Sequence, residues 1–278
     1  MTLKACIIGH PVAHSRSPLI HGYWLREHGI DGAYERADVP PGELPAFLQS
    51  LAERGFVGAN VTVPHKEEAF RCAAVVHPSA EKLGAANTLW LEDGRLNAAN
   101  TDALGFLANL DAEAPGWDAG LGEAIVLGAG GAARAVVYGL LERGAGTVHV
   151  VNRGRERAEE LAVFFGPGVR THGFDDLPQL LGRAGLLVNA TSLGMAGKPP
   201  LEVDLAGLAP GALVADLVYV PLETPLLAQA RARGHRAVDG LGMLLHQAVP
   251  GFQRWFGVRP EVTPALRNLI VAEIESKA

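Results

Sequence analysis

The chain has 278 residues, of which 48% are hydrophobic and 19% charged, and its formal net charge is -6 at pH 7. This composition is typical of a soluble globular protein with one large or two medium domains, and the acidic balance argues against a surface for nucleic acid or an anionic membrane. No uncharged apolar run approaches the roughly 18–20 residues that span a bilayer, and a His-Pro turn comes too early for a signal peptide. Together with the acidic charge, this leads us to expect neither a nucleic-acid partner nor membrane contact.

The first predicted strand covers residues 5–8 and ends at Gly9. A polar loop follows, in which Ser17 is placed to cap a helix and Pro18 to begin it, with the helix running to about His28. Ser15 and Ser17 stand at alternate positions after a strand. They either close a turn and cap the helix, or face a crevice at the carboxyl end of the strand. From the residues alone, the turn and the cap are the stronger interpretation.

A second strand is predicted over residues 34–39 and a leucine-bearing helix over 43–54. The next segment alternates as a strand through Val63, and Pro64 suits the first turn of the following helix. Lys66 falls in that first turn, where the positive end of the helix dipole disfavours an ammonium group. A solvated lysine is the commoner case, but its position at the carboxyl end of a strand favours a chemical role.

Residues 86–102 are predicted to form a hairpin with the turn Asp93-Gly94, after a short helix over 79–83. Asn87 begins one strand, and Asn100 and Asp102 follow the other. Taken singly, each Asn is a turn residue and Asp102 is the N-cap of a helix over 103–110.

Four segments of this half resemble the substrate-domain motifs of the shikimate dehydrogenase family in order and spacing. They are Ser15-Arg16-Ser17-Pro18, Gly58-Ala-Asn-Val-Thr-Val-Pro-His-Lys66, Gly84-Ala-Ala-Asn-Thr88 and Asn100-Thr-Asp102. The resemblance implies that Lys66 and Asp102 are catalytic. The substrate-binding set is Ser15, Ser17, Asn60, Thr62, Asn87, Asn100, Tyr219 and Gln247. These neutral hydroxyl and amide groups suit a small polyol carboxylate, whose hydroxyls need partners that both donate and accept.

The second half is organised around a glycine-rich turn. An apolar strand over 124–127 precedes Gly128, Gly130 and Ala133, spaced G-x-G-x-x-A, and a helix continues to Leu141. This order favours a dinucleotide site with the phosphates over the helix N-terminus, although such turns also occur for structural reasons alone. The expected cofactor contacts here are Gly128, Ala129, Gly130, Gly131 and Ala132.

The strand predicted over 147–151 ends at Asn152-Arg-Gly-Arg155, without the acid that NAD enzymes present to the ribose 2′-hydroxyl. Guanidinium groups bind a 2′-phosphate, so Asn152, Arg153 and Arg155 favour NADP over NAD and over a methyltransferase cofactor. The alternative is a solvated helix face with Arg155 paired to Glu159. The resembling family usually has a hydroxyl residue where Gly154 stands, so we expect looser cofactor discrimination.

Further strands are predicted over 186–189, 213–217 and 236–238, which give a doubly wound sheet over 122–239. Residues 114–122, rich in Gly, Pro and Ala, are expected to form a loop between domains. Tyr219 is either a packed rim aromatic or a substrate-facing hydroxyl. The resemblance adds the cofactor contacts Thr191, Ser192, Leu217, Gly240 and Met243. It also returns the chain after Gly240 to the first domain, with an amphipathic helix over 264–274 packed there.

The sequence therefore predicts a two-domain α/β protein: a substrate domain of residues 1–102 plus 240–278, and a Rossmann-type NADP domain of residues 103–239. The resemblance implies reversible, NADPH-dependent reduction of 3-dehydroshikimate to shikimate, a precursor of chorismate and the aromatic amino acids. The alternatives are an NAD-dependent quinate/shikimate dehydrogenase and a non-catalytic NADPH or metabolite sensor. We expect a cytoplasmic protein, because Cys6 and Cys72 show neither a disulfide pattern nor metal-ligand spacing. The expected state is a monomer or homodimer, between which the sequence does not decide.

Overall fold

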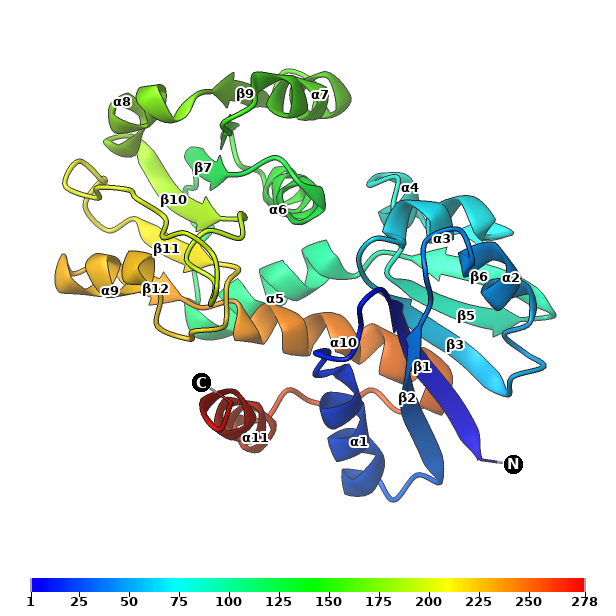
Figure 1. Cartoon of the computed structure of the whole chain (residues 1–278). Coiled ribbons are helices and arrows are strands. Elements are labelled where there is room, and N and C mark those ends of the chain that lie inside the picture. The colour runs from blue at the N-terminus through cyan, green and yellow to red at the C-terminus, as the bar shows by residue number, and fades with distance from the viewer. Residues whose placement is uncertain (1, 278) are drawn as a thin grey trace. The chain divides into compact units, whose positions relative to one another are not determined.

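Residues 2–277 are described by the computed structural model of the chain, and they divide into two units. The first runs up to Thr101 and includes Leu245–Lys277, and the second is Asp102–Leu244. Each unit is built on a six-stranded sheet with helices packed on it (Figure 1). No helix in the described part of the chain is long and apolar enough to cross a membrane.

The sheet of the first unit has the strand order β2-β1-β3-β5-β6-β4. Its strands are β1 (Leu3–Gly9), β2 (Gly32–Asp38), β3 (Phe56–Val61), β4 (Val75–Val76), β5 (Thr88–Glu92) and β6 (Arg95–Ala99). Strand β1 pairs in parallel with β2 and β3, whereas β5 runs antiparallel to β3 and β6. Because β2 and β3 add to opposite edges of β1, the strand order reverses there, and ligands bind beyond the carboxyl ends of strands at such a point.

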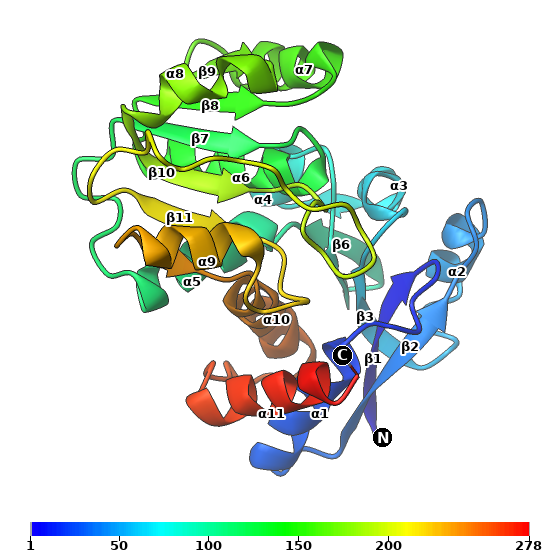
Figure 2. The same cartoon turned by 60° about the vertical axis from the view of Figure 1, so that its left-hand side comes forward.

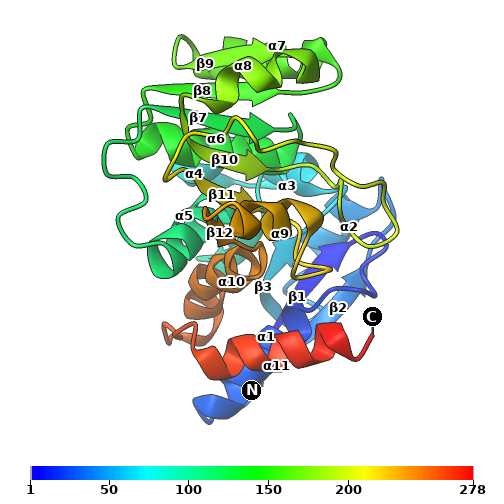
Figure 3. The ribbon, with the colours of Figure 1, turned by 90° about the vertical axis from the view of Figure 1, so that its left-hand side faces the viewer.

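The helices of the first unit form two apolar clusters. They are α1 (Ser17–Glu27), α2 (Leu44–Gln49), α3 (Lys66–Cys72), α4 (Pro78–Glu81), most of α10 (Leu241–Phe256) and α11 (Pro264–Glu275). One cluster packs α2, α3 and α4 on the sheet, and the other joins His21 and Trp24 of α1 to Phe252 of α10. Helix α11 lies alongside α1 (Figures 2 and 3), so the predicted return of the C-terminal helices to the first domain is confirmed.

The sheet of the second unit is wholly parallel, in the order β12-β11-β10-β7-β8-β9. Its strands are β7 (Glu123–Leu127), β8 (Thr147–Val151), β9 (Val169–His172), β10 (Ala184–Asn189), β11 (Leu213–Asp216) and β12 (Arg236–Val238). Figure 2 shows β8, β7, β10 and β11 side by side. The chain builds outward from β7 to β9 and resumes on the other side of β7 at β10. The predicted doubly wound sheet is confirmed.

Helices cover both faces of this sheet. They are α5 (Asp102–Glu113), α6 (Gly131–Glu142), α7 (Arg155–Phe165), the 3₁₀-helix η1 (Phe174–Asp176), α8 (Leu177–Leu181) and α9 (Pro225–Ala232). Val126 belongs to the core under α5, α6 and α7, and its neighbour Ile125 to the core under α8 and α9. Since successive strand residues face opposite sides, covering both faces requires the continuous apolar run seen at β7.

Three predicted boundaries in the first unit are wrong. Arg16, not Ser17, precedes α1, and Ser15 Oγ accepts the N–H of Ser17 at 3.3 Å. Strand β3 ends at Val61, because the His65 N–H closes a turn on the Thr62 carbonyl at 3.0 Å, and Pro64 lies in that turn before α3. Helix α2 ends at Gln49 rather than near residue 54, because the Ser50 hydroxyl bonds back to carbonyls of the last turn.

Residues 114–122, expected between domains, lie inside the second unit. Trp117 and Leu121 are buried in the core beside α5 and α6. The indole of Trp117 donates to Asp111 at 2.9 Å, and Arg143, directly after α6, pairs with Asp111 and with Asp118. The segment is rich in small residues, but its few large apolar side chains pack it against the sheet, so it is not a linker.

Candidate active site

Ser15 and Ser17 lie just beyond the carboxyl end of β1. Their hydroxyl oxygens are 3.3 Å apart. Arg36 donates to the Ser15 carbonyl at 2.6 Å, and Arg16 Nε lies 2.6 Å from Glu273 Oε2. Because the backbone of the loop is held from both sides, the two hydroxyl groups are presented together rather than on a mobile turn.

Asn60 and Thr62 mark the carboxyl end of β3. Asn60 Oδ1 accepts from the Tyr34 hydroxyl at 2.6 Å, and its Nδ2 donates to the Asn87 carbonyl at 3.1 Å. The amide oxygen has two lone pairs, so it can still accept from a substrate hydroxyl. A Cβ on Gly9 would overlap the Thr62 methyl group, which shows how closely the ends of β1 and β3 approach.

Asn87 joins the two ends of the β5–β6 hairpin. It is 4% exposed, and its Oδ1 accepts from the Thr101 N–H and the Thr88 hydroxyl, each at 2.9 Å. Asn100 Nδ2 donates to the Ala85 carbonyl at 3.0 Å. The Thr101 hydroxyl donates to the backbone carbonyl of Gln247 at 2.9 Å. The structure thus brings the predicted residues Asn87, Asn100 and Gln247 to one end of this sheet.

Lys66 is the first residue of α3, and its backbone is fixed on both sides. Its carbonyl accepts the Ala86 N–H at 2.8 Å. The preceding His65 is 1% exposed, with Nε2 2.6 Å from the Val39 carbonyl. Glu67 and Glu68 follow in the same turn and offset the unfavourable position of an ammonium at a helix N-terminus. His65 was not predicted, although its place between Pro64 and Lys66 in the motif was a signal.

Asp102 is the first residue of α5 and is 5% exposed. It therefore belongs to the first helical turn, and the prediction that it precedes the helix as N-cap is wrong by one position. A carboxylate in the first turn is favoured by the helix dipole. Such burial is unusual for an acid with only that role, because a buried carboxylate requires polar partners.

The glycine turn joins β7 to α6. Gly128 has φ 106°, and a Cβ there would lie 3.0 Å from Thr191 Cγ2 and 3.1 Å from the Ala190 carbonyl oxygen, so only glycine fits. At Gly130 and Gly131 a Cβ would meet no protein atom within 4 Å. Open space thus lies over the first amides of α6, flanked by Ala129 and Ala132, and a pyrophosphate fits there.

The turn after β8 presents two exposed arginine side chains. Asn152 Nδ2 donates to the Gly154 carbonyl at 2.8 Å. Arg153 and Arg155 are exposed, and neither forms a salt bridge within residues 2–277. The alternative Arg155–Glu159 pair is therefore not formed. Two accessible guanidinium groups and an amide fit the 2′-phosphate of NADP.

A buried acid that the sequence analysis missed holds the ends of β10 and β11. Asp216 is 1% exposed and accepts from Asn189 Nδ2 at 2.8 Å, the Val218 N–H at 3.0 Å and the Thr224 hydroxyl at 2.7 Å. Burial raises the pKa of Asp216, and these hydrogen bonds oppose the rise. Asn189 in turn accepts from the Thr191 hydroxyl at 2.7 Å. The only sequence signal was an acid at the end of an apolar strand.

The remaining predicted cofactor residues lie in the loops after β10 and β11 and at the start of α10. Ser192 follows Thr191, and Leu217 donates its N–H to the Asn189 carbonyl at 2.9 Å. A Cβ on Gly240 would overlap the Leu217 carbonyl. Met243 is 8% exposed and packs in the core with α5 and α6. Tyr219 stands two residues beyond Leu217, in the same loop.

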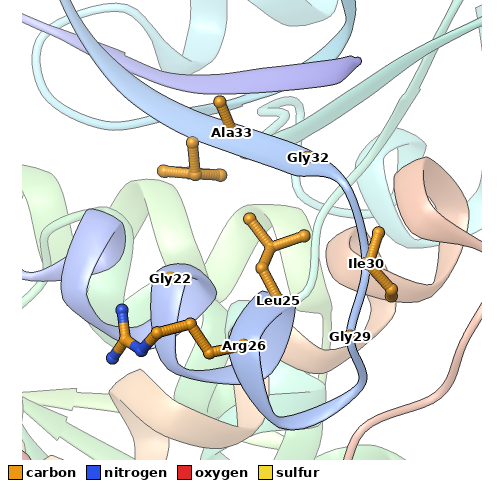
Figure 4. A pocket seen from close by; sticks show the side chains of 8 residues that line it. Gly22, Leu25, Arg26, Gly29, Ile30, Gly32 and Ala33 are labelled. Atoms are coloured by element: carbon orange, nitrogen blue, oxygen red, sulfur yellow. The ribbon is translucent and has the colours of Figure 1, made fainter. Parts of the chain in front are cut away.

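One pocket lies apart from these residues. It has a volume of about 320 Å³ and is formed by α1 and β2 (Figure 4). Its lining is Gly22, Leu25, Arg26, Gly29, Ile30, Gly32, Ala33 and Tyr34. It contains one charged side chain and none of the predicted site residues, so it is not the candidate active site. Within residues 2–277 no group of three His, Cys, Asp or Glu side chains is arranged to hold a metal ion.

Three family models match the chain. The shikimate dehydrogenase substrate binding domain matches residues 7–89, the shikimate/quinate 5-dehydrogenase model residues 118–196, and the shikimate 5′-dehydrogenase C-terminal domain residues 240–267. The shikimate dehydrogenase (NADP(+)) of Azorhizobium caulinodans is 61% identical over 274 residues, which are 99% of this chain and 98% of that protein.

Two solved structures are close in fold. Shikimate 5-dehydrogenase of Thermus thermophilus, in complex with NADP(H) and shikimate, aligns with a TM-score of 0.85 at 38% identity, covering 98% of this chain and 100% of that chain. Quinate dehydrogenase of Corynebacterium glutamicum, in complex with NAD, aligns with a TM-score of 0.90 at 30% identity, covering 98% of this chain and 99% of that chain. Both similarities extend over the two units.

Proposed function

The chain belongs to the shikimate dehydrogenase family, and we propose that it catalyses the reversible, NADPH-dependent reduction of 3-dehydroshikimate to shikimate. This reaction leads to the precursors of the aromatic amino acids. The observation that carries the proposal is the combination of two residue sets. Lys66 and all of the hydroxyl and amide groups except Tyr219 belong to the first unit, and the open glycine turn, Arg153 and Arg155 follow strands of the second. We assign residues 1–102 plus 240–278 to the substrate and 103–239 to NADP.

On the cofactor side, bound NADPH supplies the hydride. The amides that begin α6, at Gly130 and Gly131, bind the pyrophosphate. Asn152, Arg153 and Arg155 bind the 2′-phosphate. The residues assigned to the nicotinamide and its ribose are Thr191, Ser192, Leu217, Gly240 and Met243.

On the substrate side, Lys66 acts at the carbonyl oxygen. Its ammonium donates a hydrogen bond to the ketone, stabilises the alkoxide as hydride adds to the carbon, and provides the proton. Asp102 binds the same reacting group, and its carboxylate relays a proton from solvent water to the lysine amine, which restores the ammonium. The carboxylate and hydroxyls of the substrate are held by Ser15, Ser17, Asn60, Thr62, Asn87, Asn100, Tyr219 and Gln247, since hydroxyl and amide groups both donate and accept.

The test is an absorbance assay at 340 nm with the purified chain. We expect kcat/KM for shikimate with NADP+ to exceed that for every other pairing of shikimate or quinate with NADP+ or NAD+. Binding of NADPH and shikimate without turnover would instead support a sensor.

A second candidate, NAD-dependent oxidation of quinate, is favoured by one observation. Gly154 has no side chain for a 2′-phosphate, and its carbonyl engages Asn152 Nδ2 at 2.8 Å. The same assay separates the two, because a higher kcat/KM for quinate with NAD+ would establish the second.

We further propose that the enzyme works in the cytoplasm as a monomer or homodimer. Both cysteines are free, with Cys6 buried, as is usual in a reducing compartment. A mass measurement in solution tests the oligomeric state.

A further inference from the structure

A row of titratable side chains crosses the second sheet, outside the residues assigned above. Glu123 at the start of β7 lies 3.0 Å from His149 Nε2, with His149 in the middle of β8. His149 Nδ1 lies 2.9 Å from Nε2 of His172, the last residue of β9. His172 Nδ1 lies 4.0 Å from Asp176 Oδ2 in η1. His149 is only 5% exposed, and two histidines in direct contact at this depth need an explanation.

The hydrogen bonds fix where protons can lie. The Glu123 carboxylate only accepts, so His149 Nε2 carries a hydrogen. In a neutral His149, Nδ1 is then bare and accepts from His172 Nε2, which leaves His172 Nδ1 bare and facing Asp176. One added proton at His172 Nδ1 breaks no bond and places an N–H opposite a carboxylate. A second would set two N–H groups against each other. The pair is therefore built to change charge by one.

This pair lies directly beside the proposed 2′-phosphate site. The Asn152 N–H donates to the His172 carbonyl at 3.1 Å, so the end of β9 carries the turn that holds Asn152 and Arg153. Burial first, and then His149, lower the pKa of His172, and Arg183 and Arg155 add to the effect. Arg155 is also one of the assigned phosphate ligands.

The charges around His172 come from several elements. Asp176 of η1 raises the pKa of His172, against the cations named above. Glu123 also receives Arg183 Nε at 3.3 Å, and Arg170 of β9 stands opposite His149 in the strand register. A phosphate bound at Arg155 offsets the cations, and it thereby favours the added proton on His172.

We propose that His172, oriented by His149, determines cofactor preference by taking up a proton when the 2′-phosphate of NADP(H) binds. Preference for NADPH over NADH then increases as the pH falls from about 8 to about 6, because the bound phosphate offsets the cations that lower the pKa of His172 and moves it back towards the ordinary histidine value of about 6.5. The inference rests on the proposed function, because it requires that NADPH is the ligand. The protonated His172 would supply a cationic group beside the turn where Gly154 contributes no side chain.

The experiment measures Kd for NADPH and NADH at about pH 6 and about pH 8 by fluorescence titration, in the wild type and in His172→Gln. We expect the Kd for NADH divided by the Kd for NADPH to rise as the pH falls from about 8 to about 6, and to rise about fivefold more in the wild type than in the variant. One charge that interacts with the phosphate across a partly solvated gap would produce an effect of this size. The cofactor phosphate also titrates in this range, but equally for both proteins. Calorimetry in two buffers of different ionisation enthalpy should show extra proton uptake with NADPH in the wild type only.

The matched control is His28→Gln, an exposed histidine of the first unit, which should follow the wild type. Unchanged NADH affinity shows that His172→Gln is folded. If His172→Gln does not fold, Glu123→Gln is used in its place, because Glu123 is 30% exposed and lies at the other end of the row. This variant should reduce the change in cofactor preference between the two pH values. Identical pH dependence in the wild type and in the folded variant overturns the inference. Absence of NADPH binding at both pH values would instead overturn the proposed function.

Discussion

The position of Lys66 depends on neighbouring residues outside the proposed substrate-binding set. The buried His65 ring is bonded to the Val39 carbonyl, and the Lys66 carbonyl is bonded to Ala86. These contacts fix the backbone of Lys66. Only the rotamers of its long side chain therefore have to be ordered when a ligand binds. The NVTVPHK segment is thus a structural unit: a strand end, a turn, an anchor and a functional amine.

Replacing Lys66 by Ala should lower kcat by about 100-fold or more, within the range for loss of acid–base assistance, while KM for shikimate changes much less. Steady-state kinetics with NADP+ at saturating concentration measures this. Lys82→Ala, at an exposed position at the end of α4, is the matched control and should retain wild-type kcat. An unchanged kcat in the Lys66 variant would remove the assigned role.

Asp102→Asn is the companion test, because asparagine keeps the shape but loses the charge. If the acid takes part in proton transfer, kcat falls by about 100-fold while the thermal midpoint moves by a few degrees at most. A lower midpoint with unchanged kcat would return Asp102 to a role in starting α5.

Among the elements, the loops after β10 and β11 depend on one carboxylate. Asp216→Asn replaces one carboxylate oxygen by an amide NH2 group that faces hydrogen-bond donors. At least one buried donor therefore loses its acceptor, which costs about 1–3 kcal/mol of unfolding free energy. We expect lower unfolding free energy in urea, and a KM for NADPH raised several-fold because Thr191 and Leu217 lose their support. KM for shikimate should change less. The exposed Asp175→Asn is the control, and equal KM values in both variants would contradict this positioning role.

The elements that could be predicted carry strong local signals. The hairpin turn was readable because Asp93 and Gly94 both adopt positive φ, at 51° and 70°, which few residue pairs tolerate. The buried strands of the second sheet were readable as apolar runs. Strand β9 was not predicted, because Val169 is its only buried residue, and the five-residue helix α8 is too short to show a period.

The positions of candidate site residues were predictable where a motif places a residue beside a strand or at the start of a helix, as for Asn87 and Lys66. The supporting residues were not predictable, because their partners are distant in sequence. Asp216 bonds to Asn189 and Thr224, and His149 to Glu123 and His172. Periodicity reports which face a side chain occupies, but not which polar group across the sheet meets it.

For the molecule as a whole, one part of the pH dependence of stability follows from His21. Its ring stacks on Tyr34 with centroids 4.0 Å apart, and within the described residues neither ring nitrogen has a hydrogen-bond partner. Burial lowers the pKa of His21 to about 3, and the nearby Asn60 amide opposes this only in part. The unfolded chain, with an ordinary histidine, therefore binds the proton first. The contribution of His21 to stability is fully present above about pH 6.5 and decreases as the pH falls towards 3.

His21→Phe should remove this dependence, because a phenyl ring keeps the stack on Tyr34 and cannot be protonated. Between about pH 7 and about pH 5 the wild type should lose about 2 kcal/mol more unfolding free energy than the variant. Tryptophan fluorescence in urea follows the transition, since Trp24 and Trp255 pack around the ring of residue 21. His28→Gln, on the exposed end of α1, should behave as the wild type. Equal losses in the wild type and in His21→Phe would mean that the His21 ring takes up its proton inside the folded aromatic cluster, and other groups would then have to set the acid limit of this fold.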